Sequence, residues 1–453
     1  MPVAIGPRAR RASLVALWGF AVALLWTFVV FPRFSAIEPL FDVNAFGRIG
    51  ESIHSGQGFS RGYGPTLRRA PLYPYLVAGA LGLGGFDPAH RQQSYVPLLV
   101  LQCAFAGIWC AISLLIADTL FGPRAGLAAG LLCSVYPQCL RYLGAVEVEA
   151  TMTLLITLMT WTSLRLVRRP SASAAASGGL VTGLAVLAKP LPLLYPLVVA
   201  WLLWTRARRR RERYPAAALA IYVVVMAIVV APWVVRNHLV THGRYLGISA
   251  NASGEFLRGY VTAWPEFWLL RRPFRGNWDV AANRFEAALL RRRGLDYDTF
   301  RKESVGNSLL KDRVENRIAA RMVIGRPLVF ARKVAIQALT FWYLVETPAK
   351  SLAVGLLALL ALGLAARGAS LAWRDGVSVA PLVATVLYFN VLYAVVLAFA
   401  RYSMPVFPSL LALSAGGLVG CSPRRAKPGA AARECADAPA AAHLACERLS
   451  PHE

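Results

Sequence analysis

The chain has 453 residues, 57% of them hydrophobic, and its mean hydropathy is +0.50. These values exclude an ordinary soluble domain and predict an all-α polytopic membrane protein. The formal net charge of +26 would favour a nucleic-acid partner in a soluble protein. In a chain this apolar, basic loops beside anionic lipid explain the charge better, so membrane lipids are predicted as partners and nucleic acid is not.

The first apolar run, Leu14–Phe31, follows three arginines near the start of the chain. It is long enough to cross the hydrocarbon layer, and no small-x-small cleavage site follows it. We therefore predict an uncleaved first membrane span.

Further apolar runs along the chain bring the predicted number of spans to about ten. The fifth and sixth runs meet at Lys189-Pro190, where the proline breaks the helix and predicts a tight hairpin. The aromatic segment 330–348 is predicted to be an interfacial helix. The predicted spans are 14–32, 97–117, 125–143, 148–167, 175–190, 191–205, 216–235, 350–366, 378–399 and 403–421.

The short basic loops fall on one side of the membrane if the spans alternate from an inside N-terminus. This orientation predicts a multi-pass protein of the cell (inner or plasma) membrane with both termini in the cytoplasm. Two long loops, 33–96 and 236–333, then lie outside the cytoplasm and carry surface helices. Residues 1–420 form the membrane domain, and the Ala/Pro-rich tail 421–453 is predicted to be a disordered cytoplasmic segment.

Asp42 stands about ten residues after the first span, in the first long loop. A Gly-rich stretch at 55–60 and a basic, Pro-rich one at 68–74 follow it. One interpretation is a helix cap that starts a helix over 46–53. The other is a general base at the membrane surface, ionised at neutral pH because an ordinary Asp has a pKa of about 3.9. The two interpretations are compatible.

Two acids, Glu147 and Glu149, lie at the start of the fourth predicted span. Carboxylates facing lipid would be costly, which favours a water-filled cavity. The alternative is a solvated helix start, where negative charge suits the helix dipole.

Basic residues are predicted at the same face: Lys189 at the hairpin, Arg236 after the seventh span and Arg401 after the ninth. Each alone is explained by a snorkelling side chain. Together with Arg68 and Arg69, they favour a site that binds a phosphate leaving group and stabilises its charge.

The sequence predicts no metal site. His238 and His242 are four residues apart, but no third ligand is near and Gly243 follows. No cofactor is predicted, although the use of a divalent cation stays open. No phosphate-binding loop or dinucleotide fingerprint occurs, which argues against a nucleotide-sugar donor and an ATP-driven pump.

At these residues the chain resembles the GT-C glycosyltransferases, in particular the bacterial dolichyl-phosphate-mannose-type mannosyltransferase and lipid A aminoarabinose transferase group. The resemblance extends over about residues 14–420. It departs from the family at Val43, where many relatives have a second acid, and at Arg68, where the aminoarabinose transferases have Glu. The matching segments are Asp42, Gly56–Phe59, Arg69–Pro74, Glu149, Gly183–Pro190, Ala231–Asn237 with Gly254 and Gly259 after it, and Arg401–Pro405.

The resemblance implies a GT-C-like helix bundle and an inverting hexosyl- or pentosyltransferase. The donor would be a polyprenyl-phosphate sugar and the acceptor a lipid, glycan or protein at the extracytoplasmic face. Asp42 would deprotonate the acceptor, with Glu149 as a second catalytic acid residue. The residues implied to bind the donor phosphate are Arg68, Arg69, Lys189, Arg236, Arg401 and Tyr402.

Two other functions remain. A transporter or lipid flippase would favour inverted repeats and charges within spans, whereas here no repeat is visible and the charges gather at one face. An O-antigen-ligase-type or polymerase-type enzyme would share the lipid donor but would carry its long loop late in the chain.

Overall fold

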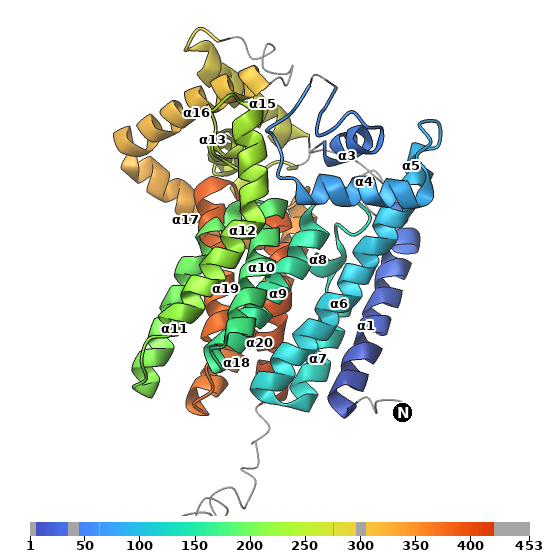
Figure 1. Cartoon of the computed structure of the whole chain (residues 1–453), viewed down its shortest axis with the longest axis vertical. Coiled ribbons are helices and arrows are strands. Elements are labelled where there is room, and N and C mark those ends of the chain that lie inside the picture. Colours follow the sequence, from blue (N-terminus) through green and yellow to red (C-terminus); the bar gives the residue numbers. More distant parts are fainter. Residues whose placement is uncertain (1–5, 35–44, 63, 275, 296–304, 421–453) are drawn as a thin grey trace, which may run out of the picture.

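The computed structural model describes residues 6–34, 45–62, 64–274, 276–295 and 305–420. Within these ranges the chain is almost entirely helical, and the one β interaction is a bridge between Ser60 and Pro65. Long helices form a bundle, and shorter helices gather at one of its ends (Figure 1). The predicted all-α membrane fold is therefore confirmed.

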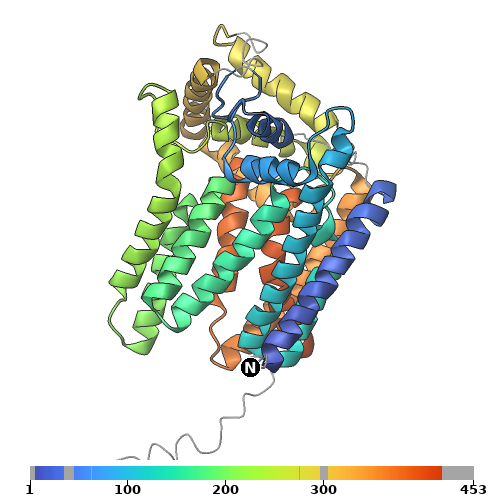
Figure 2. The same cartoon turned by 45° about the vertical axis from the view of Figure 1, so that its right-hand side comes forward.

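The bundle consists of helices that run roughly along its long axis (Figures 1 and 2). Six helices in the described residues are long and apolar enough to cross a membrane, so the predicted span count of about ten stays a prediction. The bundle helices are α1 (Pro7–Leu25, continued by a π-helical turn and α2, Phe31–Phe34), α6 (Val96–Phe121), α7 (Pro123–Val135), α9 (Glu149–Arg168), α10 (Ala172–Ala188), α11 (Tyr195–Arg210), α12 (Ala216–Val240), α18 (Pro348–Arg374), α19 (Ala380–Val396) and α20 (Phe407–Val419).

Most helices at the end of the bundle, here called the cap, come from the two predicted long loops, whereas α17 lies largely beyond the second loop (Figure 1). The apolar helix α4 lies across the bundle and was not predicted, because its 13 residues are too few for a span. The segment predicted as an interfacial helix at 330–348 forms most of α17. The cap helices are α3 (Phe46–His54), α4 (Leu72–Gly84), α5 (Arg91–Ser94), α13 (Ala252–Thr262), α14 (Pro265–Trp268), α15 (Asn277–Arg291), α16 (Val305–Gly325) and α17 (Pro327–Tyr343).

The predicted span 125–143 is wrong in its second half. Helix α7 ends at Val135, and Tyr136 is extended (φ −69°, ψ 122°) because Pro137 disfavours helical geometry at the residue before it. After the short helix α8 (Pro137–Leu140), the chain turns inward and is buried up to α9. The Gln102 side chain holds this turn by donating to the Leu143 and Ala145 carbonyls at 2.8 and 3.0 Å.

The predicted hairpin at Lys189-Pro190 is present. Helix α10 ends at Ala188, Lys189 is extended (φ −156°, ψ 128°), and a 3-10 turn over Leu191–Leu194 leads into α11. A second such break precedes α20, where the 3-10 segment Ala400–Val406 contains Pro405. Both breaks place polar side chains at the boundary between the bundle and the cap.

Close contacts at glycines bring the bundle helices together. A Cβ atom at Gly417 of α20 would lie 2.0 Å from the carbonyl oxygen of Leu364 in α18. In the same way, a Cβ atom at Gly368 of α18 would lie 2.1 Å from the carbonyl oxygen of Leu413 in α20. Small residues of this kind let membrane helices pack backbone to backbone. Helices α18 and α20 are thus packed backbone to backbone.

Candidate active site

A cavity of about 350 Å³ lies between the cap and the bundle. We call it the site cavity. Its polar wall comes from the loop before α4, the end of α10, the start of α13 and the 3-10 segment before α20. These elements bring five of the sequence-predicted residues to one place: Arg68, Arg69, Lys189, Arg401 and Tyr402.

Arg401 is held by two buried carboxylates. Its Nε and Nη2 atoms donate to the two oxygens of Glu149 at 2.7 and 2.9 Å, and Nη2 also lies 2.5 Å from Glu147 Oε2. Both glutamates are 2% exposed. Removing charges from water is costly unless they are paired and hydrogen-bonded, and this bidentate geometry meets that condition. The guanidinium of Arg401 is therefore fixed in orientation at the cavity wall.

Lys189 projects into the cavity over a pair of stacked tyrosines. Its Nζ atom lies 4.2 Å from the Tyr402 ring centre and 5.2 Å from that of Tyr393. The two rings are 4.6 Å apart and nearly parallel, at 10°. Glu149 Oε1 is 4.0 Å from the same ammonium. Cation–π attraction and this carboxylate hold the Lys189 charge at the site.

Arg68 and Arg69 enter the cavity from the loop before α4. Burial and the neighbouring charge of Arg69 lower the pKa of Arg68 to about 9, so Arg68 is still protonated at neutral pH. Burial also lowers the pKa of Arg69, whose guanidinium lies 5.3 Å from the Phe46 ring centre. Two adjacent half-buried cations would be stabilised by a bound anion.

Arg236 lies outside the site cavity. Its guanidinium lies 4.8 and 5.4 Å from the ring centres of Trp233 and Phe59, and it donates to the Thr66 carbonyl at 3.2 Å. Because Thr66 closely precedes Arg68, Arg236 braces the loop that carries the cavity arginines. Its predicted role as a phosphate ligand stays a prediction.

Glu255 of α13 also lines the cavity, and the sequence reasoning missed it. Burial opposes its charge, but Arg258, Arg69 and Arg68 lower the pKa of Glu255 below its usual value, so it is ionised at neutral pH. The signal that would have found it is its position directly after Gly254, in the glycine-bearing stretch that the sequence singled out.

The other predicted residues take different places. Asp42 lies outside the described residues, as does its predicted cap position. Glu149 sits behind Arg401 and is not among the cavity-lining residues. Helix α12 ends at Val240 and His242 has a positive φ of 51°, so His238 and His242 do not share one helical face. Among the described residues, no group of three His, Cys, Asp or Glu side chains has metal-binding geometry.

The remaining wall of the cavity is apolar. Leu193 and Leu194, in the turn before α11, are 45% and 52% exposed, and Leu392 and Val396 of α19 complete this wall. The cavity thus combines a polar wall rich in cations with an apolar wall that reaches the bundle surface. Such a site fits an amphiphile with an anionic head.

Comparison with known families supports the fold. Residues 68–235 match the model of the dolichyl-phosphate-mannose-protein mannosyltransferase family. This segment contains Arg68, Arg69, Glu149 and Lys189. No curated protein matches the chain at a significant level.

Solved structures of the oligosaccharyltransferase AglB from Archaeoglobus fulgidus are similar over most of the chain. The complex with an inhibitory peptide and a dolichol-phosphate has a TM-score of 0.54 at 13% identity, over 90% of this chain and 50% of that one. A complex with Zn and sulfate has a TM-score of 0.52 at 15% identity, over 89% and 48%. The chain therefore spans about half the length of these relatives.

ArnT from Cupriavidus metallidurans bound to undecaprenyl phosphate aligns over 90% of this chain and 78% of that one at 17% identity. Its TM-score of 0.36 is too low to support an argument. The similarity to AglB and the family match together confirm the resemblance that the sequence motifs predicted.

Proposed function

We propose that this chain, which has the fold of the GT-C glycosyltransferases, transfers a sugar from a polyprenyl-phosphate donor to an acceptor at the cap end of the bundle. One observation carries the proposal. The site cavity places Arg68, Arg69 and Lys189 beside an apolar edge that opens toward the bundle surface. A lipid-linked phosphate needs both features at once: cations for its head and a hydrophobic path for its tail.

In this proposal Arg68, Arg69 and Lys189 bind the donor phosphate, and Tyr402 holds Lys189 in place. Arg401 adds a fixed positive charge, and Glu149 acts as a positioning residue through its two hydrogen bonds to Arg401. Arg236 positions the loop before α4. These assignments keep Glu149 essential but remove it from direct contact with the reacting atoms.

The proposed reaction is an inverting displacement. The acceptor oxygen attacks the anomeric carbon while the bond from that carbon to the phosphate oxygen breaks. The polyprenyl phosphate leaves with the bonding electron pair, and the clustered cations stabilise its charge. Asp42 takes the proton of the acceptor hydroxyl. No nucleotide and no resident cofactor enters this sequence of steps.

The proposed orientation has the cap outside the cytoplasm of a cell-membrane protein and both termini inside. Its support is the distribution of arginines: the turns at the other end of the bundle, between α9 and α10 and after α11, are rich in them. Basic residues of short loops stay in the cytoplasm, whereas long segments such as the cap cross regardless of charge.

The test uses a deletion strain complemented with either the natural chain or the Asp42→Asn variant. We expect the deletion to accumulate a polyprenyl-phosphate sugar and to lose that sugar from one glycan, lipid or protein. The natural chain should restore both, and the variant should restore neither while reaching the membrane at the same level. Unchanged lipid-linked sugars and glycans in the deletion would reject the transferase, and full rescue by the variant would reject Asp42 as the base.

A further inference from the structure

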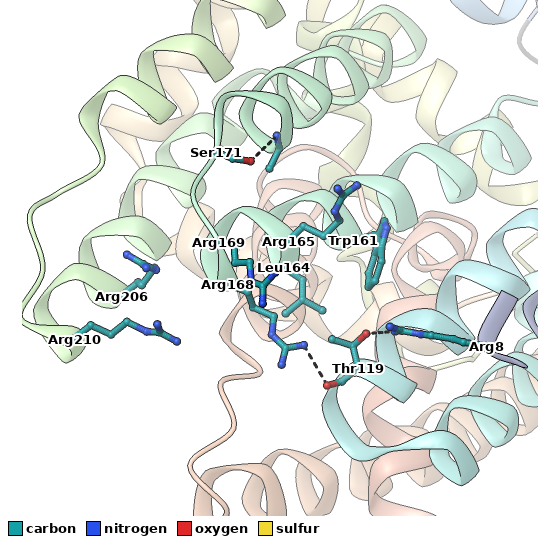
Figure 3. A pocket seen from close by; sticks show the side chains of 11 residues that line it. Arg8, Thr119, Trp161, Leu164, Arg165, Arg168, Arg169, Ser171, Arg206 and Arg210 are labelled. Carbon is teal, nitrogen blue, oxygen red and sulfur yellow. Dashed lines mark hydrogen bonds between the residues drawn. The ribbon is translucent and has the colours of Figure 1, made fainter. Parts of the chain in front are cut away.

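A second, larger cavity of about 950 Å³ lies at the end of the bundle opposite the cap, and Figure 3 shows the side chains that line it. We call it the basic cavity. It is enclosed by the start of α1, the end of α6, the turn between α9 and α10, and the end of α11. Six arginines from three separate segments of the chain line it: Arg8, Arg165, Arg168, Arg169, Arg206 and Arg210.

The acids near these arginines compensate only part of the charge. Arg8 Nε lies 2.7 Å from Asp118, while Glu212 lies 2.6 Å from Arg206 and 3.9 Å from Arg210. Arg168, at the end of α9, donates a hydrogen bond to the carbonyl oxygen of Thr119 in α6 at 3.2 Å. In the part of the chain that the structure describes, Arg165 and Arg169 form no ion pair with a carboxylate. The cavity therefore has an excess of positive charge.

The arginines of basic loops often lie scattered in solvent, where they only fix orientation. This arrangement differs from that pattern. The Arg206 side chain is only 10% exposed, and its buried Nε has no hydrogen-bond partner among the described residues. Trp161 and Leu164 of α9 supply an apolar wall beside the guanidinium groups. Guanidinium groups gathered around one cavity, with too few carboxylates to balance them, suit an anionic ligand.

We propose that the basic cavity binds the phosphate head of an anionic lipid from the leaflet at this end of the bundle. Guanidinium groups match phosphate oxygens in pairs of hydrogen bonds, and basic pockets between membrane helices bind lipid heads in this way. The volume exceeds that of a free phosphate ion, and the apolar wall suits the first part of an acyl chain. Arg165 and Arg169 are the principal ligands. The site is independent of the sugar-transfer site at the cap.

The experiment measures lipid binding to the purified full chain. The protein is placed in phosphatidylcholine nanodiscs with or without phosphatidylglycerol, and retained lipid is measured by native mass spectrometry after release. The test variant is Arg165→Gln with Arg169→Gln. The matched control is Arg208→Gln with Arg209→Gln, which removes the same charge from the same end. Those two arginines lie over the rings of Trp204 and Trp373, at 4.3 and 5.8 Å, and do not line the cavity.

We expect the natural chain and the control to retain phosphatidylglycerol, and the test variant to bind it at least about tenfold more weakly. Size-exclusion profiles of all three proteins should be the same, because Arg165 and Arg169 are exposed. Equal weakening in the control would overturn the proposal, since it would show general attraction to the membrane surface. In a second arm, inorganic phosphate is added in neutral detergent. Stabilisation by phosphate that is lost in the test variant, without retention of phosphatidylglycerol by the natural chain, would overturn the lipid as the source.

Discussion

Arg401 at the site cavity and the pair Arg165 and Arg169 at the basic cavity differ in how the fold balances their charge. At the site cavity, the Arg401 side chain is 11% exposed and is paired with two carboxylates that are themselves 2% exposed. At the basic cavity, Arg165 and Arg169 are exposed. A buried charge must be compensated by the fold, whereas an exposed one remains available to a ligand without a large cost to stability. Removal of Arg401 should therefore cost far more folding free energy than removal of Arg165 or Arg169.

The largest effect is expected at Arg401. The Arg401→Ala variant removes the guanidinium that pairs with the buried Glu147 and Glu149, which costs about 3–5 kcal/mol of folding free energy. Thermal unfolding in detergent, followed by size-exclusion chromatography, measures this loss. The control is Glu149→Gln, which leaves Arg401 paired with Glu147 and should cost less. Equal stability of Arg401→Ala and the natural chain would contradict the account.

The next largest effect is expected on donor binding, where Arg69 inside the site cavity should differ from Arg236, which only supports the loop. Arg69→Gln removes a charged ligand of the donor phosphate, and we expect the KM for the polyprenyl-phosphate donor to rise about 10- to 100-fold. Arg236→Gln, outside the cavity, should change that KM much less. Steady-state kinetics with the purified enzyme test this pair. If Arg236→Gln raised the KM as much as Arg69→Gln, the assignment of the donor site to this cavity would fail.

The stability of the fold is expected to depend on pH because of a buried carboxyl group, that of Glu315, near the helix that carries Glu255. Glu315 of α16 is buried near Glu286, accepts a hydrogen bond from Ser253 at 3.1 Å, and lies 3.6 Å from Lys311 Nζ. Burial raises the pKa of Glu315 to about 8 despite Lys311. In the unfolded chain a Glu titrates near 4.3, so between about 4.3 and 8 the folded state binds the extra proton and stability falls as pH rises. The melting temperature should drop from pH 5 to pH 8, and less so in Glu315→Gln. The same drop in both proteins would refute this origin of the slope.

The smallest effect is expected at the basic cavity. Arg165→Gln should change the free energy of unfolding by no more than about 0.5 kcal/mol in detergent without anionic lipid, because its side chain is exposed. Thermal unfolding measures this against Arg401→Ala under the same conditions. A large loss of folding free energy would contradict this expectation. It would mean that the charge of Arg165, like that of Arg401, is balanced by groups of the fold itself.

Local patterns in the sequence predicted much of this arrangement. The break at Lys189-Pro190, the basic pair Arg68-Arg69 and the Arg401-Tyr402 motif are all visible in short segments, and the structure brings them to one cavity. Glu255 was missed because one acid after a glycine has no periodicity to mark it. The Arg401–Glu149 pairing joins residues 252 positions apart, and its geometry depends on the inward turn after α8. That turn was predicted as part of a span because its residues are apolar.

The two long predicted loops also show that local sequence patterns predict positions along the chain better than arrangement in space. Their positions followed from the apolar runs on either side, but the α4 helix across the bundle did not, since its length falls below that of a span. The convergence of three basic segments on one cavity was also beyond the sequence, because each segment alone fits the positive-inside tendency. Spatial convergence is a tertiary property, and single-sequence patterns do not contain it.

The most direct test of the central claim is a structure of the purified protein with undecaprenyl phosphate. We predict phosphate density in the site cavity, within hydrogen-bonding distance of Arg69 and Lys189, with the isoprenoid chain leaving past Leu193 and Leu194. Phosphate density at the basic cavity alone, with the site cavity empty, would contradict the proposed donor site.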